Sequence, residues 1–176
     1  MAREKTKEDS EMFKKGVAVE VSSEDEGLRG SWYTATVIRN QTQTHNKILV
    51  EYHNLVADEQ GSKKLQELVD PILIRPIPPC SQGPNPPVYR VMDDVDAFHH
   101  DGWWEGVVTR VLVDNRNSPK YSVFFRCSRE QIDFSTNDLR LHREWLGGNR
   151  WNPSPSPSPS TRTRAAPSSG GRTSRR

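Results

Sequence analysis

The chain has 176 residues, of which 32% are hydrophobic, and its formal net charge is +2. This length accommodates one ordinary domain or two small ones, and the low hydrophobic content indicates that part of the chain packs no core. Five arginines and no acidic residues lie after residue 152, so residues 1–152 carry about −3, which argues against a nucleic-acid-binding face built from bulk charge and is compatible with a basic peptide ligand.

The first half of the chain reads as a charged, flexible lead-in followed by short strands. The lead-in is residues 1–11, and an acidic loop occupies residues 22–30. Residues 57–70 are charged and carry leucines at helix-compatible spacing, which predicts a loop with one helical turn. Alternation of apolar and polar residues predicts strands over 17–21, 31–38, 47–52 and 71–76, the last of which its prolines confine to an edge or an end.

The same order of segments repeats after a proline-rich connector. The second set of strand-like segments covers residues 89–98, 102–110, 120–125 and 138–142. Two repeats of roughly 60 residues, each with four or five short strands, predict two small β-barrels rather than one sandwich. Each barrel is near the lower size limit for independent stability, so we expect the two to dock and bury a shared face. The predicted boundaries are a first domain at 12–78, a linker at 79–87, a second domain at 88–152 and a disordered Ser-Pro and arginine tail at 153–176.

A hairpin in the second repeat carries two adjacent tryptophans. Asp101-Gly102 lies between two strand-like runs, which is a strong hairpin signal because glycine relieves the steric cost of a positive φ. Trp103 and Trp104 follow at once, and strand alternation places their side chains on opposite faces. One member is therefore expected to pack in a core and the other to join a cluster of aromatic faces. Such a cluster attracts a cation.

Several motifs resemble those of a plant Agenet domain. In the first repeat they are Val19-Glu-Val-Ser-Ser-Glu-Asp-Glu-Gly-Leu-Arg-Gly-Ser-Trp-Tyr33 and Val69-Asp-Pro-Ile-Leu-Ile-Arg-Pro-Ile-Pro-Pro79. In the second they are Asp96-Ala-Phe-His-His-Asp-Gly-Trp-Trp-Glu-Gly-Val-Val108 and Leu139-Arg-Leu-His-Arg-Glu-Trp145. The resemblance covers about residues 13–151 and implies an all-β fold, with two strongly bent, SH3-like or Tudor-like barrels docked in tandem. It also implies a nuclear, non-enzymatic, monomeric reader of histone H3 tails dimethylated on the ninth residue, a lysine.

The resemblance and the aromatic clustering together suggest which residues bind the ligand. A methylammonium gains roughly 0.5–2 kcal/mol from each favourable aromatic face. We favour Tyr33 and Trp104 as the cage-facing members of their pairs, while bending at the strand start would reverse that choice. The full set of cage candidates is Trp32, Tyr33, Tyr52, Phe98, His99, Trp103, Trp104 and Phe125. Acidic residues expected to pair with the basic histone tail are Glu24, Asp25, Glu26, Asp94, Asp96 and Asp101.

Two neighbouring histidines, His99 and His100, add a hypothesis of pH dependence. A neutral imidazole in the cage would attract a methylammonium and a protonated one would repel it, so binding would weaken as the pH falls from about 8 to 6. With Asp101 they also suggest a metal site, but adjacent histidines in a turn rarely point the same way and no further ligand is evident. We therefore expect no metal and no cofactor.

Other functional classes find less support in the sequence. There is no glycine-rich phosphate loop, no nucleophile elbow and no Cys-x-x-Cys pair, and Cys80 and Cys127 are read as reduced thiols. No apolar run approaches a membrane span, so a soluble, intracellular protein is expected. Two alternatives remain: an RNA- or DNA-binding module, and a scaffold that contacts other chromatin proteins without reading a mark. The arginine-rich tail is expected to contact nucleic acid only weakly.

Overall fold

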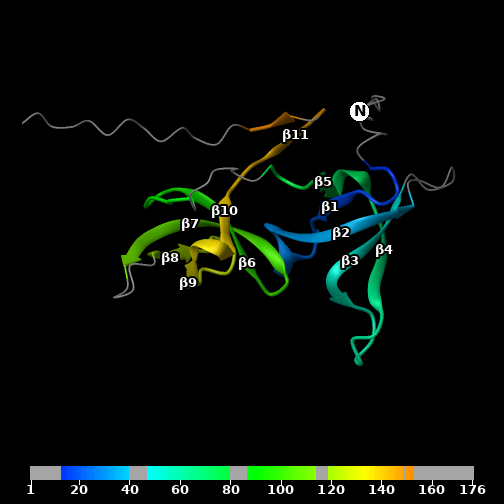
Figure 1. Cartoon of the computed structure of the whole chain (residues 1–176), viewed down its shortest axis with the longest axis horizontal. Helices are drawn as coiled ribbons and strands as arrows, with labels where there is room; N and C mark the ends of the chain where they lie inside the picture. Colours follow the sequence, from blue (N-terminus) through cyan, green and yellow to red (C-terminus); the bar gives the residue numbers. More distant parts are fainter. Residues whose placement is uncertain (1–12, 40–46, 80–86, 114–118, 149, 153–176) are drawn as a thin grey trace, which may run out of the picture.

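The computed structural model describes residues 13–39, 47–79, 87–113, 119–148 and 150–152. Within these ranges the chain forms β-strands joined by loops and three short 3₁₀ helices (Figure 1). The all-β prediction is therefore confirmed. The predictions for the lead-in at 1–11, for most of the linker at 79–87 and for the tail at 153–176 lie outside the described residues.

The first domain, β1 to β5, is a five-stranded antiparallel sheet in the order β5-β1-β2-β3-β4. Strict alternation of buried and half-buried residues along β2 shows one face turned to the core, as the sequence pattern predicts. Its elements are β1 (Ala18–Val21), η1 (Glu26–Leu28), β2 (Ser31–Arg39), β3 (Ile48–Val56), β4 (Lys64–Val69), η2 (Pro71–Leu73) and β5 (Ile74–Pro76).

The prediction of a loop with one helical turn at 57–70 was wrong, because β4 occupies the second half of that segment and pairs with β3. Leu65, Leu68 and Val69 have helix-compatible spacing, yet Leu68 is exposed and only Val69 is fully buried. Backbone pairing with the free edge of β3 decides the conformation here, and a local pattern does not report that pairing.

The second domain, β6 to β10, repeats the first strand for strand, in the order β10-β6-β7-β8-β9. Equivalent strands β2 and β7 even bulge at equivalent places, between Val37 and Arg39 and between Val108 and Arg110, where a bulge bends the strand. The ladders do not join the two ends of either sheet, so closure into barrels stays a prediction. The elements are β6 (Asp94–His99), β7 (Gly102–Val113), β8 (Pro119–Phe124), β9 (Gln131–Ser135), η3 (Thr136–Asp138) and β10 (Leu139–Leu141).

The two domains dock through a strand pair, which confirms the predicted tandem arrangement. β2 pairs antiparallel with β7, with Ser31 opposite Trp104 and Trp32 opposite Trp103, so one continuous sheet crosses both domains. Each domain keeps its own hydrophobic core, and the side chain of Trp104 packs against both. Figure 1 shows the two sets of strands side by side, with β2 reaching toward the second domain.

The turn between β6 and β7 is the predicted hairpin, but its geometry differs from the prediction. His100 and Asp101 hold the positive φ angles, at 46° and 61°, which is the pattern of a two-residue type I′ turn. Gly102 does not supply a positive φ. A side chain there would instead place its Cβ 2.9 Å from Cε1 of Tyr33 in the other domain, so the docking of the domains requires glycine at this position.

The turns that precede β1 and β6 are also equivalent, although their residues differ. Gly16 has a φ of 88° and donates its backbone N–H to Val37 O at 2.8 Å. Met92 has a φ of 78° and donates in the same way to Val108 O at 2.8 Å. A methionine in this region is strained, since its Cβ approaches the neighbouring carbonyl oxygen.

A small hairpin after β10 was not predicted. It consists of β11 (Trp145–Gly147) and β12 (Arg150–Trp151), and its two tryptophan rings lie 5.3 Å apart. The segment returns to the first domain, because Arg75 Nη1 donates to the backbone oxygen of Arg143 at 3.1 Å. β11 lies beyond β10 on the side of the molecule where β5 runs (Figure 1).

Candidate ligand-binding groove between the domains

The interface between the domains is built from the same residues twice. In the first domain Glu20 on β1 lies opposite Arg75 on β5, and in the second Asp96 on β6 lies opposite Arg140 on β10. Arg75 Nε donates to Glu20 Oε2 at 2.9 Å, and Arg140 Nε donates to Asp96 Oδ2 at 3.0 Å. We call these four residues, with Trp32 and Trp103, the seam.

The ion pairs of the seam also cross from one domain to the other. Arg140 Nη1 and Nη2 lie 2.5 and 3.0 Å from the carboxylate oxygens of Glu20, and Arg75 Nη2 lies 3.6 Å from Asp96 Oδ2. Both carboxylates are essentially inaccessible, with side-chain exposures of 1% and 0%. Two buried carboxylates are thus balanced by two guanidiniums, an arrangement that is stable only when every charge has a partner.

His142, which follows β10, adds a titratable group to the seam. Its Nδ1 lies 2.6 Å from Asp96 Oδ1. Burial opposes ionisation of Asp96, but the hydrogen bond from His142 and the charge of Arg140 outweigh it, and the pKa of Asp96 lies below its usual range. The same hydrogen bond raises the pKa of His142 against the opposing effect of burial.

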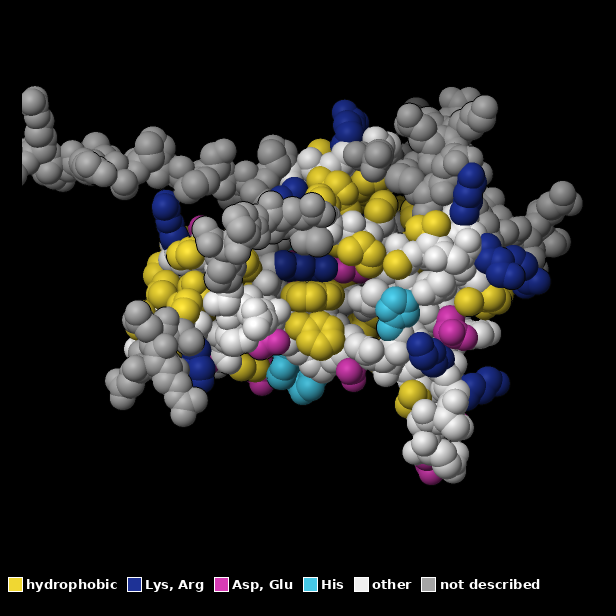
Figure 2. Space-filling model, viewed as in Figure 1, with side chains coloured by type: hydrophobic (Ala, Val, Ile, Leu, Met, Phe, Trp, Pro, Cys, Tyr) yellow, Lys and Arg dark blue, Asp and Glu magenta, His cyan; other side chains and the backbone are white. Residues whose placement is uncertain are grey.

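Each seam tryptophan already stacks on a cation of its own domain. The guanidinium carbon of Arg75 lies 3.7 Å from the ring centroid of Trp32, and that of Arg140 lies 4.2 Å from the ring centroid of Trp103. In the view of Figure 2, a basic side chain near the middle of the molecular surface lies against hydrophobic side chains. One face of each of these cage candidates therefore serves the interface between the domains.

Three other cage candidates lie inside the cores. Tyr33 and Tyr52 belong to the first core, with ring centroids 6.5 Å apart, and Phe125 belongs to the second. The hydroxyl of Tyr52 donates to Glu67 Oε2 at 2.7 Å. Burial and this hydrogen bond raise the pKa of Tyr52 well above its usual value. All three are buried in these cores, and their predicted role in a cage stays a prediction.

The remaining cage candidates surround the tip of the β6–β7 hairpin. Trp104 donates its indole N–H to His99 O at 2.7 Å and faces away from Trp103, as strand alternation predicts. Phe98 packs edge-on against Trp103, with centroids 5.2 Å apart. The ring of His99 lies 3.7 Å from that of His100; burial, followed by the charge of that neighbour, lowers the pKa of His99. The predicted role of these histidines in a pH-dependent cage stays a prediction.

The acidic candidates divide into exposed residues and one buried residue. Asp96 is fully buried in the seam, so its carboxylate serves the interface between the domains and does not reach the surface. Asp94 is half exposed and pairs with Arg126 at 2.9 Å. The others, which are exposed, are Glu24, Asp25, Glu26 and Asp101.

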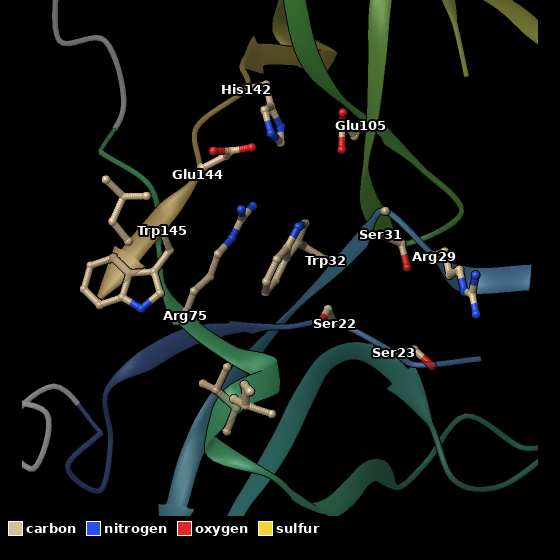
Figure 3. A pocket seen from close by; sticks show the side chains of 14 residues that line it. Ser22, Ser23, Arg29, Ser31, Trp32, Arg75, Glu105, His142, Glu144 and Trp145 are labelled. Carbon is tan, nitrogen blue, oxygen red and sulfur yellow. The ribbon is translucent and has the colours of Figure 1, made fainter. Parts of the chain in front are cut away.

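A groove of about 470 Å³ lies beside the seam, between the first domain and the segment after β10 (Figure 3). Trp32 on β2 and Trp145 on β11 contribute aromatic surface to it, and Glu105 on β7 and Glu144 contribute carboxylates. Figure 3 shows Trp32 and Trp145 on either side of the Arg75 side chain, with Glu144 above them. The lining residues are Ser22, Ser23, Arg29, Gly30, Ser31, Trp32, Ile72, Ile74, Arg75, Glu105, His142, Glu144, Trp145 and Leu146.

The groove is lined by the carboxylates of Glu105 and Glu144 and by the basic groups of Arg29, Arg75 and His142, so an excess of negative charge comes from the adjoining loop. The exposed residues 24–26 belong to the loop between Ser23 and Arg29, both of which line the groove. Glu105 pairs with Arg126 at 3.2 Å, whereas among the described residues the carboxylate of Glu144 has only a 3.5 Å contact, with the side-chain amide of Asn152. Aromatic surface beside incompletely neutralised carboxylates is an environment suited to a cationic side chain.

Among the cage candidates, only Trp32 lines this groove. Sequence reasoning gave no binding role to Trp145, Glu105 or Glu144, although Trp145 stood within a motif of the resemblance. The one available signal was the number of tryptophans, since five exceed the packing needs of two small cores. Within the described ranges, no group of three or more His, Cys, Asp or Glu residues is placed to hold a metal ion. Nor does that part of the chain contain a helix long and apolar enough to cross a membrane.

Comparison with known sequences finds that residues 16–79 match the model of the Agenet domain. One curated relative, Protein AGENET DOMAIN (AGD)-CONTAINING P1 of Arabidopsis thaliana, is 47% identical over 145 residues, which cover 80% of this chain and 27% of the relative. Another, DUF724 domain-containing protein 3 of Arabidopsis thaliana, is 37% identical over 140 residues, which cover 79% of this chain and 19% of the relative. The chain thus spans about a quarter or less of the length of these relatives.

Two solved structures share both the fold and the tandem arrangement. The crystal structure of Arabidopsis thaliana AGDP1 AGD34 superposes with a TM-score of 0.71 at 35% identity, covering 86% of this chain and 99% of that one. The crystal structure of the ADCP1 tandem Agenet domain 3-4 superposes with a TM-score of 0.67 at 34% identity, covering 82% of this chain and 89% of that one.

Proposed function

The chain belongs to the plant Agenet family of Tudor-like domains, and on this basis we propose that it is a nuclear chromatin reader that binds the tail of histone H3 dimethylated on its ninth residue, a lysine. The observation that supports this proposal is the groove, in which Trp32 and Trp145 lie beside Glu105 and Glu144. The protein acts by binding, without a chemical step or a cofactor.

The groove offers the two interactions that a methylated basic peptide needs. Methylation removes N–H donors and makes the ammonium group less costly to dehydrate, so an aromatic surface competes well with water for it. Arg75 covers one face of Trp32, and the ring of Trp145 lies 5.3 Å from that of Trp151, so each tryptophan offers at most one face to a ligand. The carboxylates of Glu105, Glu144 and residues 24–26 then pair with unmodified basic side chains of the same peptide.

The size of the effect follows from these contacts. A favourable cation–π contact is worth roughly 0.5–2 kcal/mol, and about 1.4 kcal/mol corresponds to tenfold in affinity. We therefore expect the dimethylated peptide to bind about tenfold more tightly than the unmodified one. With a few backbone contacts to the peptide, the dissociation constant falls on the order of micromolar.

Isothermal titration of the full chain with unmodified and dimethylated H3 peptides tests the proposal. Trp145→Ala should remove most of the preference for the methylated peptide, and Trp145→Phe should retain part of it. Glu144→Gln should weaken the binding of both peptides to the same extent. Glu59→Gln, a change at an exposed acid outside the groove, should weaken the binding of neither. Equal affinity of the unsubstituted chain for the two peptides would refute the methyl-lysine proposal.

A further inference from the structure

The groove lies at the point where the described part of the chain ends. The backbone N–H of Asn152 donates to Glu144 O at 2.9 Å, and its side-chain amide lies 3.5 Å from Glu144 Oε2. Glu144 lines the groove. The segment that begins at residue 153 is therefore attached to a residue that contacts the groove-lining Glu144.

The sequence of that tethered segment is complementary to the groove. Residues 153–176 contain no acidic residue, and their five positive charges are Arg162, Arg164, Arg172, Arg175 and Arg176. The groove presents Glu144 and Glu105, and the adjoining loop adds the exposed acids of residues 24–26. Arg29, which also lines the groove, offsets one of these charges, while Arg75 is neutralised by its buried ion pair with Glu20. Guanidinium groups also stack well on tryptophan, and both Trp32 and Trp151 already accept Arg75 in this way.

We propose that the arginine-rich segment of residues 161–176 docks in the groove of its own chain and competes there with an external basic peptide. The docking depends only on the charges and the tether. The competition, in contrast, rests on the proposed function, since it requires that a histone tail uses the same groove.

The tether has a suitable length. Arg162 lies ten residues after Asn152, and four of the nine residues between them are prolines, so this stretch can span up to about 31–35 Å. Because Asn152 contacts Glu144, which lines the groove, the groove lies within that span of the attachment point. A tether of this length gives an effective concentration of about 1 mM, well above the protein concentration in a titration, so docking within the chain is favoured over docking on a second copy.

We expect the docked tail to lower moderately the affinity of the groove for external ligands. If the free tail binds with a dissociation constant of about 0.1 mM, an effective concentration of about 1 mM keeps the groove about 90% occupied. External basic peptides then bind about tenfold more weakly than to an unoccupied groove. The tail thereby sets a threshold that only a ligand with additional contacts, such as a methylated side chain, overcomes.

The test uses the full chain with all five tail arginines changed to glutamine, so that its length is kept. A synthetic peptide of residues 153–176 is titrated into this variant, with tryptophan fluorescence and chemical-shift changes as readouts. We expect saturable binding at submillimolar concentrations, weakened at least threefold by Glu144→Gln and by higher salt, and unchanged by Glu59→Gln. A matched peptide with glutamine in place of arginine should not bind. Absence of binding at millimolar peptide would overturn the docking.

The second measurement addresses the competition. The dimethylated H3 peptide should bind about tenfold more tightly to the five-arginine variant than to the unsubstituted chain, independently of protein concentration. Equal affinities would refute the competition, and a difference that grows with protein concentration would show that the tail docks on a second copy instead. If the tail peptide binds but no histone peptide does, the docking stands and the proposed function fails.

Discussion

Replacing Glu20 by glutamine tests whether the seam holds the two domains together. The substitution keeps the shape of the side chain and removes one of two buried carboxylates, leaving Arg75 and Arg140 to share Asp96. Removing one partner from a buried ion pair costs about 3–5 kcal/mol, because a charge is left without compensation. Glu20 is 1% exposed and contacts both guanidiniums within 3.0 Å, so the full range applies. For a chain of this size, that loss lowers the melting temperature by about 10 °C.

Urea denaturation at pH 7, followed by tryptophan fluorescence and circular dichroism, measures the effect. A matched control is Arg126→Gln, which breaks an ion pair with Asp94 in which both side chains are about half exposed. An exposed pair contributes at most about 1 kcal/mol, so this control should stay close to the unsubstituted chain. If Glu20→Gln costs no more than the control, the seam does not stabilise the fold in the way that its geometry implies.

Three further predictions concern single positions. Gly102→Ala should cost about 1–3 kcal/mol in urea denaturation, because its Cβ would lie 2.9 Å from the Tyr33 ring; an unchanged midpoint would contradict the close packing. Met92→Gly should stabilise the fold by about 0.5–1 kcal/mol by relieving a φ of 78°, and a lower melting temperature would count against backbone strain there. The raised pKa of His142 means that its contribution to folding stability is complete below about pH 6.5 and is lost as the pH rises through its folded-state pKa. The lowered pKa of Asp96 has the opposite effect: its contribution to stability is complete above about pH 4 and is lost as the pH falls through its folded-state pKa. A stability profile that does not decline above pH 6.5, or declines equally in His142→Gln, would refute this assignment.

The sequence predicted the fold well where the signal is local. Alternation along 31–38 and the repetition of the same segments after the connector gave two all-β units, and both are present. Strand β4 was missed because its partner is the edge of β3, and β9 was missed for the same kind of reason, since it pairs with β8. Short edge strands with exposed polar residues carry little periodic signal, and long-range backbone pairing specifies them.

The candidate groove was harder to predict, because the aromatic residues that stand out in the sequence serve several structural roles. Tyr33 and Tyr52 fill a core, Trp32 and Trp103 stack on arginines, and a sequence pattern does not separate these tasks from ligand binding. The seam itself could have been anticipated in part, since Glu20 and Asp96 are acidic residues at equivalent strand positions. An acid in the middle of an apolar strand needs a buried partner.

The two repeats also differ around the proposed groove. Duplication gives each domain an acid, an arginine and a tryptophan at equivalent positions, and the seam uses all six. The groove, in contrast, is lined largely by segments that the repeats do not share: the long loop at 22–30, where the second domain has only a two-residue turn, and the segment from His142 to Leu146. The repeated residues hold the two domains together. We therefore expect selectivity for a ligand to depend mainly on the residues that have no equivalent in the other domain. We therefore expect substitutions in residues 22–30 to change which peptide the proposed groove binds, and equivalent changes in the β6–β7 turn to leave peptide binding unchanged.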